Sequence, residues 1–380
     1  MNLKVMLVFA SIVLLSVSIV GSSASQEKVP VIIGFKDKND PALVKEHGGE
    51  IKREYTLINA IAANLPENKI EVLKKNPNVV YVESDRIVQA LAETTPWGVT
   101  KINAPLVWQN TNNNKGTGIK VAILDTGIQY NHPDLINNIK GGVNFAGNPD
   151  GSTNSKYWTD KHGHGTHVAG TVAAVGNNNI GVIGVAPEAS LYAVKVLNNA
   201  GFGYTSDIIQ GIQWAADNAD IASMSFGSSS YSQAEKDAVD AARALGIILV
   251  AAAGNSGDGN PLTDNVGYPA RYDNVIAVAA TNSNDAVASF SSDGSEVDVA
   301  APGVSIYSTY KGSSYASLSG TSMAAPHVTG TVALMLKAGV LPNDIQSKLQ
   351  TTVVDINSPG FDVFSGYGRI NAFSATQITP

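Results

Sequence analysis

The chain has 380 residues, of which 44% are hydrophobic and 15% charged, and its formal net charge is −7. It contains no cysteine, which excludes a catalytic thiol, a cysteine-ligated zinc site and any disulfide framework. The negative net charge gives nucleic-acid binding no electrostatic support. The length allows one large domain together with a smaller additional segment.

The first residues predict a secretory signal peptide. Lys4 precedes an apolar stretch over residues 5–20, and small residues follow at 21–24. Cleavage is expected after Ala24 or Ser25, which makes residues 1–25 the leader. The alternative is a membrane anchor, but this stretch is shorter than the roughly 20 residues needed to span a bilayer. We therefore predict export and no stable membrane anchoring.

Residues 26–91 differ in charge from the rest of the chain. They carry ten Lys and Arg against ten Asp and Glu, whereas residues 92–380 carry 14 against 22, a net charge of −8. Their patterns run strand, helix, strand, strand, helix and strand, at residues 29–35, 41–48, 50–55, 60–64, 67–76 and 79–82. This βαββαβ order predicts a small α+β, ferredoxin-like domain in which two short helices cover one sheet.

Apolar, β-rich runs alternate with helical patterns throughout residues 92–380. The expected strands lie at residues 119–124, 191–196, 221–225, 247–252 and 275–279, and the expected helices at 164–175, 206–218, 233–245 and 322–337. This alternation predicts an α/β domain with three layers, α/β/α, and a mostly parallel central sheet. Residues 141–162 are expected to form a long surface loop.

Polar residues at the ends of separate predicted strands should meet at one edge of the sheet. Asp125, Ser225 and Asn255 stand at or just after such ends, and ligands bind beyond the carboxyl ends of strands in sheets of this kind. His164 and Ser322 instead open helical patterns. A serine hydroxyl needs a base to take its proton and a third group to orient that base. Ser322, His164 and Asp125 are of the residue types that supply these parts.

Each of these residues also has a structural alternative. Ser322 could cap the helix that follows it, and Asp125 could cap a turn. His164 stands near His162 and His167, which raises the alternative of a metal site. Offsets of two and three residues lack the i, i+4 histidine pair and the HExxH glutamate of zincins, so zinc is disfavoured. His167 is then expected to be structural.

The motifs around these residues resemble those of the subtilisin-like serine proteases, the subtilases. Asp125 lies in VAILDTG, His164 in HGHGTHVAG and Ser322 in SGTSMAAPH, in the chain order Asp, His, Ser. Similar stretches are TTPWGVTKI, NHPDL, NNIGVIGVAP, VAAAGNSG and YPARYDNVIAV, so the resemblance covers essentially all of residues 92–380. It implies a serine endopeptidase with a triad of these residues and an acyl-enzyme intermediate. Asn255, otherwise a loop asparagine, would stabilise the oxyanion together with the backbone N–H of Ser322.

The resemblance also implies a precursor. Residues 26–91 take the position of a subtilase propeptide, which acts as folding template and temporary inhibitor, and residues 92–380 would be the catalytic domain. Cleavage between Leu91 and Ala92 would present a leucine to the enzyme's own specificity pocket. The alternative is a permanent regulatory or binding domain. We expect a secreted monomer that acts on protein and peptide substrates.

A substrate cleft made of backbone and small side chains is implied as well. An extended peptide would lie along strand edges and place a large apolar or aromatic side chain in a pocket with small walls. The flanking residues are Gly201, Phe202, Gly203, Ser225, Phe226 and Gly227, and the pocket residues are Ala252, Ala253, Gly254 and Gly267. Many subtilases carry Leu where this chain has Phe226, so this ring is expected to reshape a pocket for a residue upstream of the cut.

The resemblance finally implies a calcium site. Calcium takes six to eight oxygen ligands from carboxylates, amides and backbone carbonyls. The implied ligands are Glu93, Asp134, Gly176, Asn178, Ile180 and Val182. Glu93 stands where Gln is frequent in the family, which adds negative charge to the site.

Two other classes of function stay open at this stage. An esterase of the α/β-hydrolase type would carry its serine in GxSxG, whereas Ser322 lies in GTSMA and the chain order differs. A non-catalytic secreted binding protein on the same scaffold would usually have lost a catalytic residue, and none is missing here.

Overall fold

The computed structural model describes residues 28–85, 93–147 and 150–378. The chain divides into two compact units, Met1–Gln89 and Ala90–Pro380. The predicted signal peptide and the predicted junction between Leu91 and Ala92 lie outside the described residues.

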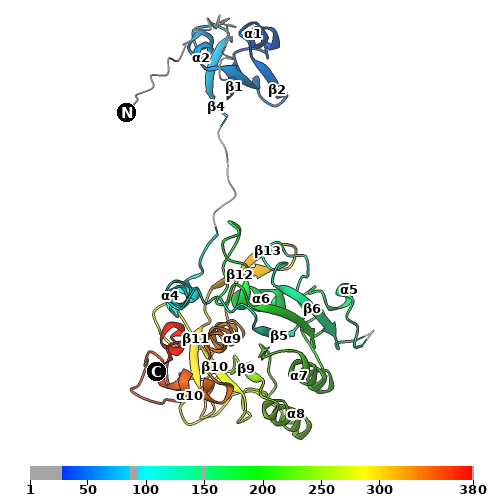
Figure 1. Cartoon of the computed structure of the whole chain (residues 1–380), viewed down its shortest axis with the longest axis vertical. Helices are drawn as coiled ribbons and strands as arrows, with labels where there is room; N and C mark the ends of the chain where they lie inside the picture. Colours follow the sequence, from blue (N-terminus) through cyan, green and yellow to red (C-terminus); the bar gives the residue numbers. More distant parts are fainter. Residues whose placement is uncertain (1–27, 86–92, 148–149, 379–380) are drawn as a thin grey trace, which may run out of the picture. The chain divides into compact units, whose positions relative to one another are not determined.

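The described part of the first unit is one antiparallel sheet with two short helices (Figure 1). Its elements are β1 (Lys28–Phe35), α1 (Pro41–Glu46), β2 (Glu50–Glu54), β3 (Ala60–Pro66), α2 (Glu67–Leu73) and β4 (Val79–Ser84). The strand order is β2-β3-β1-β4. A small core forms where Ile33, Ile61 and Leu65 of the sheet meet Val44 of α1 and Leu73 of α2. The predicted βαββαβ order is confirmed, with both helices shorter than expected.

A seven-stranded sheet forms the centre of the second unit, and all of its strand pairs are parallel. Its strands are β5 (Lys120–Asp125), β6 (Ile139–Asn144), β7 (Ser190–Lys195), β8 (Ile221–Met224), β9 (Ile248–Ala252), β10 (Ile276–Thr281) and β11 (Val299–Pro302). The order β11-β10-β9-β8-β5-β7-β6 places β5 where the chain changes direction across the sheet. The carboxyl end of β5 is therefore the expected place for a binding site.

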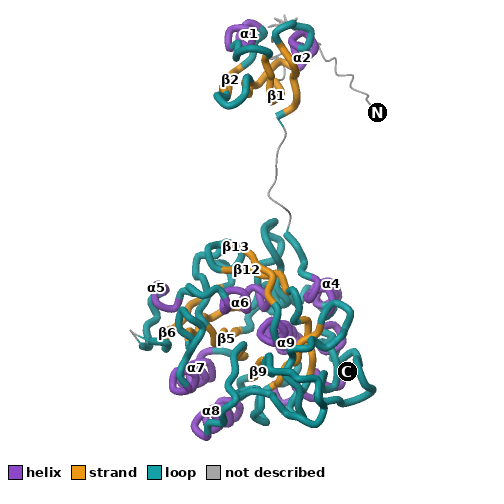
Figure 2. The backbone as a smooth tube through the Cα atoms, turned by 180° about the vertical axis from the view of Figure 1, so that it is seen from behind, coloured by secondary structure: helices purple, strands orange, loops and turns teal. Residues whose placement is uncertain are grey.

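Helices cover both faces of this sheet, as Figures 1 and 2 show. Alternate side chains of β5 enter two separate cores. Val121 and Ile123 pack on one face with α6 (His164–Ala173) and α9 (Thr321–Ala338). Ala122 and Leu124 pack on the other face with α7 (Thr205–Asn218) and α8 (Gln233–Ala244). Strands buried on both faces are apolar throughout, which is why they were recognisable in the sequence. The three-layer α/β/α prediction is confirmed.

Smaller elements surround these layers. They are the hairpin of β12 (Ile306–Tyr310) and β13 (Ser314–Leu318), and the short helices α3 (Trp97–Lys101), α4 (Ala104–Asn110), α5 (Ser155–Trp158), η1 (Pro342–Asp344), α10 (Ile345–Thr351) and α11 (Ala372–Ala375). The prediction of a loop over residues 141–162 is wrong for its two ordered pieces, β6 and α5. Two consecutive glycines weaken the strand signal in β6, and the buried Trp158 of α5 packs against β6.

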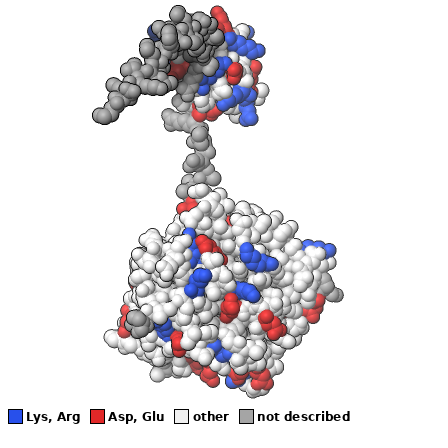
Figure 3. All heavy atoms as spheres, in the orientation of Figure 1, with Lys and Arg blue, Asp and Glu red and all other residues white. Residues whose placement is uncertain are grey.

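The surface of the second unit carries few charges on the face drawn in Figure 3, where Lys and Arg are interspersed with Asp and Glu. In the described part of the chain, no helix combines the length and the hydropathy that a membrane crossing requires.

Candidate active site

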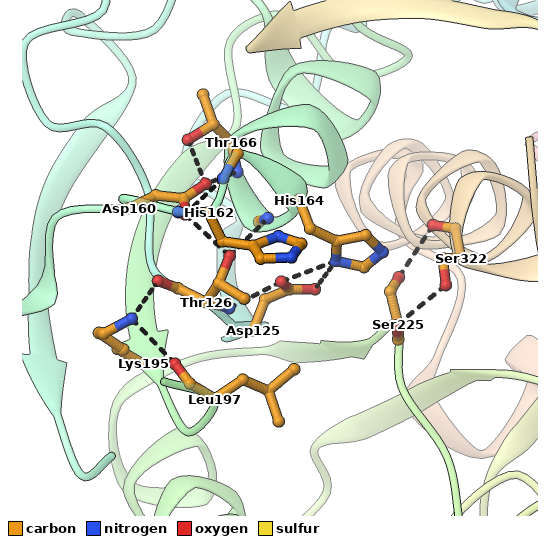
Figure 4. A network of polar contacts seen from close by, with 12 residues as sticks. Asp125, Thr126, Asp160, His162, His164, Thr166, Lys195, Leu197, Ser225 and Ser322 are labelled. Carbon is orange, nitrogen blue, oxygen red and sulfur yellow. Dashed lines mark hydrogen bonds and ion pairs between the residues drawn. The ribbon is translucent and has the colours of Figure 1, made fainter. Parts of the chain in front are cut away.

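Asp125 and His164 form a hydrogen-bonded pair at the carboxyl end of β5. Asp125 is the last residue of this strand and is fully buried, and His164 is the first residue of α6. The Nδ1 atom of His164 lies 2.8 and 2.9 Å from the two carboxylate oxygens of Asp125 (Figure 4). The backbone N–H of Thr126 donates to Asp125 Oδ1 at 2.7 Å. Nδ1 of the imidazole is therefore occupied by the hydrogen bond to Asp125, and Nε2 remains available for a second hydrogen-bond partner.

The pKa of His164 lies above its ordinary value. Burial by itself lowers it, but the charge of the Asp125 carboxylate and the hydrogen bond to it together outweigh burial. Asp160 contributes a smaller effect in the same direction. The imidazole is thereby tuned as a base that accepts a proton readily and is stabilised once it carries the charge.

The Asp160 carboxylate holds the N-terminal turn of α6, which carries His164. Its Oδ1 accepts from Thr126 Oγ1 at 2.9 Å and from the backbone N–H groups of His162 and Gly163 at 2.8 Å. Its Oδ2 accepts from the backbone N–H and the hydroxyl of Thr166 at 2.9 and 2.7 Å (Figure 4). Sequence reasoning missed Asp160, although a carboxylate just before a helix start is a recognisable signal.

Gly165 allows α6 to approach β5 closely. A Cβ atom on this residue would stand 3.0 Å from the Cβ of Asp125 and closer still to the carbonyl oxygen of Gly127. Any side chain here would push the helix away from the strand. The glycine after His164 therefore keeps the imidazole within reach of Asp125.

Lys195 is a second residue that sequence reasoning missed. Its side chain is buried, and its ammonium group donates to the carbonyl oxygens of Thr126 and Leu197 at 2.6 and 2.9 Å. Burial lowers its pKa to about 8, and the negative charges of Asp160 and Asp125 oppose this shift. Lys195 thus places a positive charge behind the two carboxylates and ties the start of the next loop to Thr126.

Ser322 lies at the start of α9, where Thr321 is the first helical residue. Its hydroxyl donates to the carbonyl oxygen of Ser225 at 3.0 Å, and the Ser225 hydroxyl donates back to the carbonyl of Ser322 at 3.0 Å. Among the described residues, no hydrogen bond joins this hydroxyl to His164. In the view of Figure 4 the imidazole stands between the Asp125 carboxylate and Ser322. Rotation about the Cα–Cβ bond of Ser322, which is partly exposed, is the motion that a proton transfer to the imidazole requires.

Asn255 presents its amide N–H₂ beside Ser322. Its carbonyl oxygen accepts from the backbone N–H and the hydroxyl of Thr321 at 2.9 and 3.1 Å, and since the backbone N–H only donates, this contact fixes which way the amide points. A methyl group built on Gly320 would stand 3.5 Å from Asn255 Nδ2 and 3.7 Å from the backbone nitrogen of Ser322. The Asn255 carbonyl oxygen, at 3.6 Å, already accepts from Thr321, so the groups left to bind an oxyanion in this space are the two N–H donors.

A pocket of about 220 Å³ opens next to Ser322 and Asn255. Of the predicted residues, Phe226, Gly227, Ala252, Gly254 and Gly267 line it. Residues not foreseen are Ser228, Ser229, Ser256, Asn265, Ser292 and Thr321. Ala253 is not in the lining: its side chain is buried in the core beneath the sheet, because alternate residues of an extended chain point to opposite faces.

The segment 201–203, predicted to flank the peptide, does not line this pocket. Phe202 and Gly203 line a separate hollow of about 510 Å³, and Gly201 lies beside His162. His167 is fully buried, and its Nε2 lies 2.9 and 3.1 Å from the carbonyl oxygens of Ile306 and Ala316 in the β12–β13 hairpin. Burial lowers the pKa of His167 to about 4. Its contacts agree with the structural role that was predicted.

The residues predicted to bind calcium come together around one loop between α6 and β7. The carboxylate of Glu93 accepts from the backbone N–H groups of Asn177 and Asn178 at 3.0 and 3.3 Å. The buried carboxylate of Asp134 accepts from the Asn178 amide at 2.6 Å and from the backbone N–H of Val182 at 2.9 Å. Gly176 and Ile180 stand in the same loop, where Ile180 N–H donates to Asn178 Oδ1 at 3.0 Å.

This loop supplies the kind of donors that a hard cation takes. In the described part of the chain, no group of three or more His, Cys, Asp or Glu side chains is placed to hold a metal. The predicted set holds only two carboxylates, and amide and carbonyl oxygens make up the remainder. Burial raises the pKa of Asp134, although its hydrogen bonds oppose this. Asp134 also accepts from the Tyr315 hydroxyl, yet burial outweighs all of these donors, so a cation beside this carboxylate would stabilise its charge and the residues fit a bound cation.

A serine, a histidine held by a buried aspartate, and two amide donors beside a pocket define the class of serine hydrolases. Residues 116–368 match the subtilase family, and residues 20–91 match the peptidase inhibitor I9 family. The chain is 44% identical to subtilisin E of Bacillus subtilis (strain 168) over 375 residues, which cover 96% of this chain and 94% of that protein.

Two further relatives are proteases as well. The alkaline protease of Alkalihalobacillus alcalophilus is 41% identical over 380 residues, and alkaline elastase YaB of Bacillus sp. (strain YaB) is 40% identical over 380 residues; each match covers 95% of this chain and 94% of the relative. The chain belongs to the subtilase family and is a serine endopeptidase preceded by an I9-type propeptide domain.

Proposed function

We propose that this protein is a secreted serine endopeptidase in which Asp125, His164 and Ser322 act as a triad. The observation that carries the proposal is the double contact of His164 Nδ1 with the Asp125 carboxylate at 2.8 and 2.9 Å. This contact selects the tautomer with its proton on Nδ1, so Nε2 has a free lone pair for the Ser322 proton.

In the proposed reaction, Ser322 Oγ turns from Ser225 to His164 Nε2, gives up its proton and attacks the carbonyl carbon of the scissile peptide bond. The oxyanion is held by Asn255 Nδ2 and the Ser322 N–H. The imidazolium returns the proton to the leaving amine, and the carbon–nitrogen bond breaks. Water, deprotonated by His164, then hydrolyses the acyl-enzyme and Ser322 recovers its proton.

The pocket beside Ser322 supports a preference for a large apolar or aromatic side chain before the cut. Its volume of about 220 Å³ and its small lining residues leave room for such a side chain. Phe226 lines this pocket and also packs against the core, so it narrows one wall. The remaining contacts would come from backbone groups of residues 225–227 and 201–203, which makes the specificity broad.

We further propose that the chain is a self-processing precursor made of a signal peptide (1–25), a propeptide (26–91) and a catalytic domain (92–380). The propeptide would act as an inhibitor and folding template, and the mature enzyme would work as a monomer outside the cell. The match of residues 20–91 to the I9 inhibitor family supports this role. Determining the N-terminus of the secreted protein by mass spectrometry tests export and cleavage after Leu91 together.

Calcium is proposed as a stabilising ligand and takes no part in the reaction. Oxygens of Glu93, Asp134, Gly176, Asn178, Ile180 and Val182 would hold it. The buried charge of Asp134 supports this assignment. Bound calcium would tie residue 93 and the loop over 176–182 to the rest of the domain.

Hydrolysis of a tetrapeptide anilide with Phe or Leu before the cut tests the activity. A serine-directed phosphonate should abolish it, and the Ser322→Ala variant should show none. An esterase would hydrolyse short acyl esters and leave casein intact, and a binding protein would cleave neither. Either result would contradict the proposal.

A further inference from the structure

A hollow of about 510 Å³ is lined by aromatic rings and carboxylates. The rings belong to Phe145, Phe202 and Tyr204, and the carboxylates to Asp150 and Asp207. The described lining residues include no Lys or Arg. Aromatic faces and carboxylates both attract a cation, so the hollow has the chemistry of a site for a positively charged group.

The aromatic walls are held in place by the backbone. The Asn198 side chain accepts from the N–H groups of Ala200 and Phe202 at 2.9 and 3.2 Å, and Asn198 N–H donates to the Phe202 carbonyl at 2.7 Å. This tight turn keeps the Phe202 side chain 73% exposed, and Tyr204 is 79% exposed at the start of α7. The backbone that carries Phe202 is thus held by its own hydrogen bonds, so binding does not have to order this segment of the chain.

The carboxylate of Asp207 keeps most of its capacity to accept hydrogen bonds. It stands in the first turn of α7 and accepts from the Tyr204 N–H only at 3.5 Å. The neighbouring hollow has the opposite charge, since Lys156, Lys161 and Lys195 line it. The two hollows share Ala146 and Asn198 as a boundary. A basic side chain is therefore attracted to one hollow and repelled by the next.

The hollow lies a short distance from the catalytic imidazole. A methyl group built on Gly201 would stand 3.3 Å from His162 Nε2, and the ring centroids of His162 and His164 are 6.3 Å apart. An extended peptide advances about 3.3 Å per residue. A substrate that passes His164 and runs along the turn at 201–203 therefore brings a side chain to the hollow within about four residues of the cut.

The geometry points to a subsite that binds a basic side chain, Arg or Lys, upstream of the scissile bond. This inference rests on the proposed endopeptidase function and adds a second selectivity to the apolar pocket beside Ser322. The side chain would lie against Phe202 and Tyr204 and pair with Asp207, with Asp150 contributing at the rim. The cation–π contact with the two rings and the ion pair with Asp207 both depend on the positive charge of the substrate side chain, not on its size.

A set of peptide anilides that share Phe before the cut tests the subsite. Arg, its neutral isostere citrulline, Glu and Phe are placed in turn at each of the next four upstream positions, and kcat/KM is measured with the mature enzyme. At one of these positions, kcat/KM of the Arg peptide should be about five times that of the citrulline peptide, and kcat/KM of the Glu peptide should be lower than that of the citrulline peptide. The ratio of Arg to citrulline should decrease at high salt, because the attraction is partly exposed.

Variants assign the effect to these residues. Asp207→Asn keeps the shape of the hollow and should bring the ratio of Arg to citrulline close to one, and Phe202→Ala should lower it as well. Asp217→Asn is the matched control, because Asp217 is exposed on the same helix but lies ten residues further along. This control should leave the ratio unchanged.

Two results would overturn the subsite while leaving the proposed function intact. One is a ratio of Arg to citrulline near one at every position in an enzyme that cleaves the peptides normally. The other is a preference for Phe over Arg at the responsive position, which would indicate an apolar subsite. Failure to cleave any peptide, together with no reaction with the phosphonate, would instead refute the endopeptidase function and the subsite with it.

Discussion

Two buried carboxylates of the second unit differ in how their charge is compensated: Asp160, beside the Asp125–His164 pair, and Asp134, which contacts the loop over residues 176–182. Asp160 accepts hydrogen bonds from Thr126, His162, Gly163 and Thr166, and the Lys195 ammonium lies close behind. Asp134 accepts from Val182 N–H, the Asn178 amide and the Tyr315 hydroxyl, and burial still raises its pKa.

This difference shows at which of the two carboxylates protein hydrogen bonds alone compensate the negative charge. Around Asp160, protein donors match the negative charge, so α6 is fixed and His164 is preorganised before any ligand arrives. Around Asp134, burial outweighs the protein donors and raises the pKa, so an external cation would stabilise the carboxylate charge. We therefore expect a change at Asp160 to have the same effect on stability with and without calcium, and a change at Asp134 to act through the response to calcium.

The largest expected effect is the loss of the nucleophile. Ser322→Ala should lower kcat/KM by about 10⁶-fold, since removing this member of a triad disables the whole relay. The fold of the catalytic unit should stay intact by circular dichroism, because only one hydroxyl at a partly exposed position is removed. If maturation is intramolecular, the propeptide should also stay attached. Normal cleavage in the purified variant would refute self-processing.

Asp125→Asn should lower kcat by about 10⁴-fold, the loss known for the same change in another serine protease. The base works only when neutral, so activity rises as pH passes the His164 pKa, which lies above its ordinary value of about 6.5. The variant removes the charge that raises this pKa and leaves burial, which lowers it. The acid limb of the pH–rate profile should therefore move to lower pH. A shift to higher pH would contradict the assigned pair.

The same pair contributes to stability with a defined pH dependence. Because folding raises the pKa of His164, this contribution is fully present below the unfolded pKa of about 6.5 and is lost as pH rises through the folded value.

Asn255→Leu should lower kcat by about 10²–10³-fold, the loss known for the oxyanion donor of subtilisin, with little change in KM, because the amide would contact the oxyanion only as charge develops on it. Asn260→Ala, on an exposed turn, is the control and should behave like the native enzyme. An equal rise in KM would place Asn255 in ground-state substrate binding instead.

The smallest expected effects compare the two carboxylates directly, in a Ser322→Ala background that prevents autolysis. Excess calcium at about 100 times its dissociation constant should stabilise the parent by about 2.7 kcal/mol relative to chelator. Asp134→Asn should remove most of this difference. Asp160→Asn should lower the free energy of unfolding by about 2 kcal/mol both with calcium and with chelator, because all hydrogen-bond partners of Asp160 belong to the protein. Thermal unfolding with calcium and with chelator gives both numbers, and equal calcium responses in the two variants would break the comparison.

Much of this molecule could be predicted from the sequence because the relevant signals are local. The strands β5 and β9 are apolar on both faces, and each motif brings its functional residue to a strand end or a helix start. The side-chain period of two along a strand already places Val121 and Leu124 on opposite faces, so the three layers follow from the pattern.

Other features depend on contacts between distant segments, which no local pattern records. Asp160 stood in a predicted loop, yet its partners extend from Thr126 to Thr166, and Lys195 reaches the site only because β7 pairs with β5. Ala253 was predicted to line the specificity pocket, but the fold turns its side chain into the core. Phe202, predicted to flank the peptide, lines a hollow of its own. The sequence thus determined which catalytic residue types the chain carries. Tertiary packing decided which buried charges find a hydrogen-bond or ionic partner, because this depends on distances between segments far apart in the sequence.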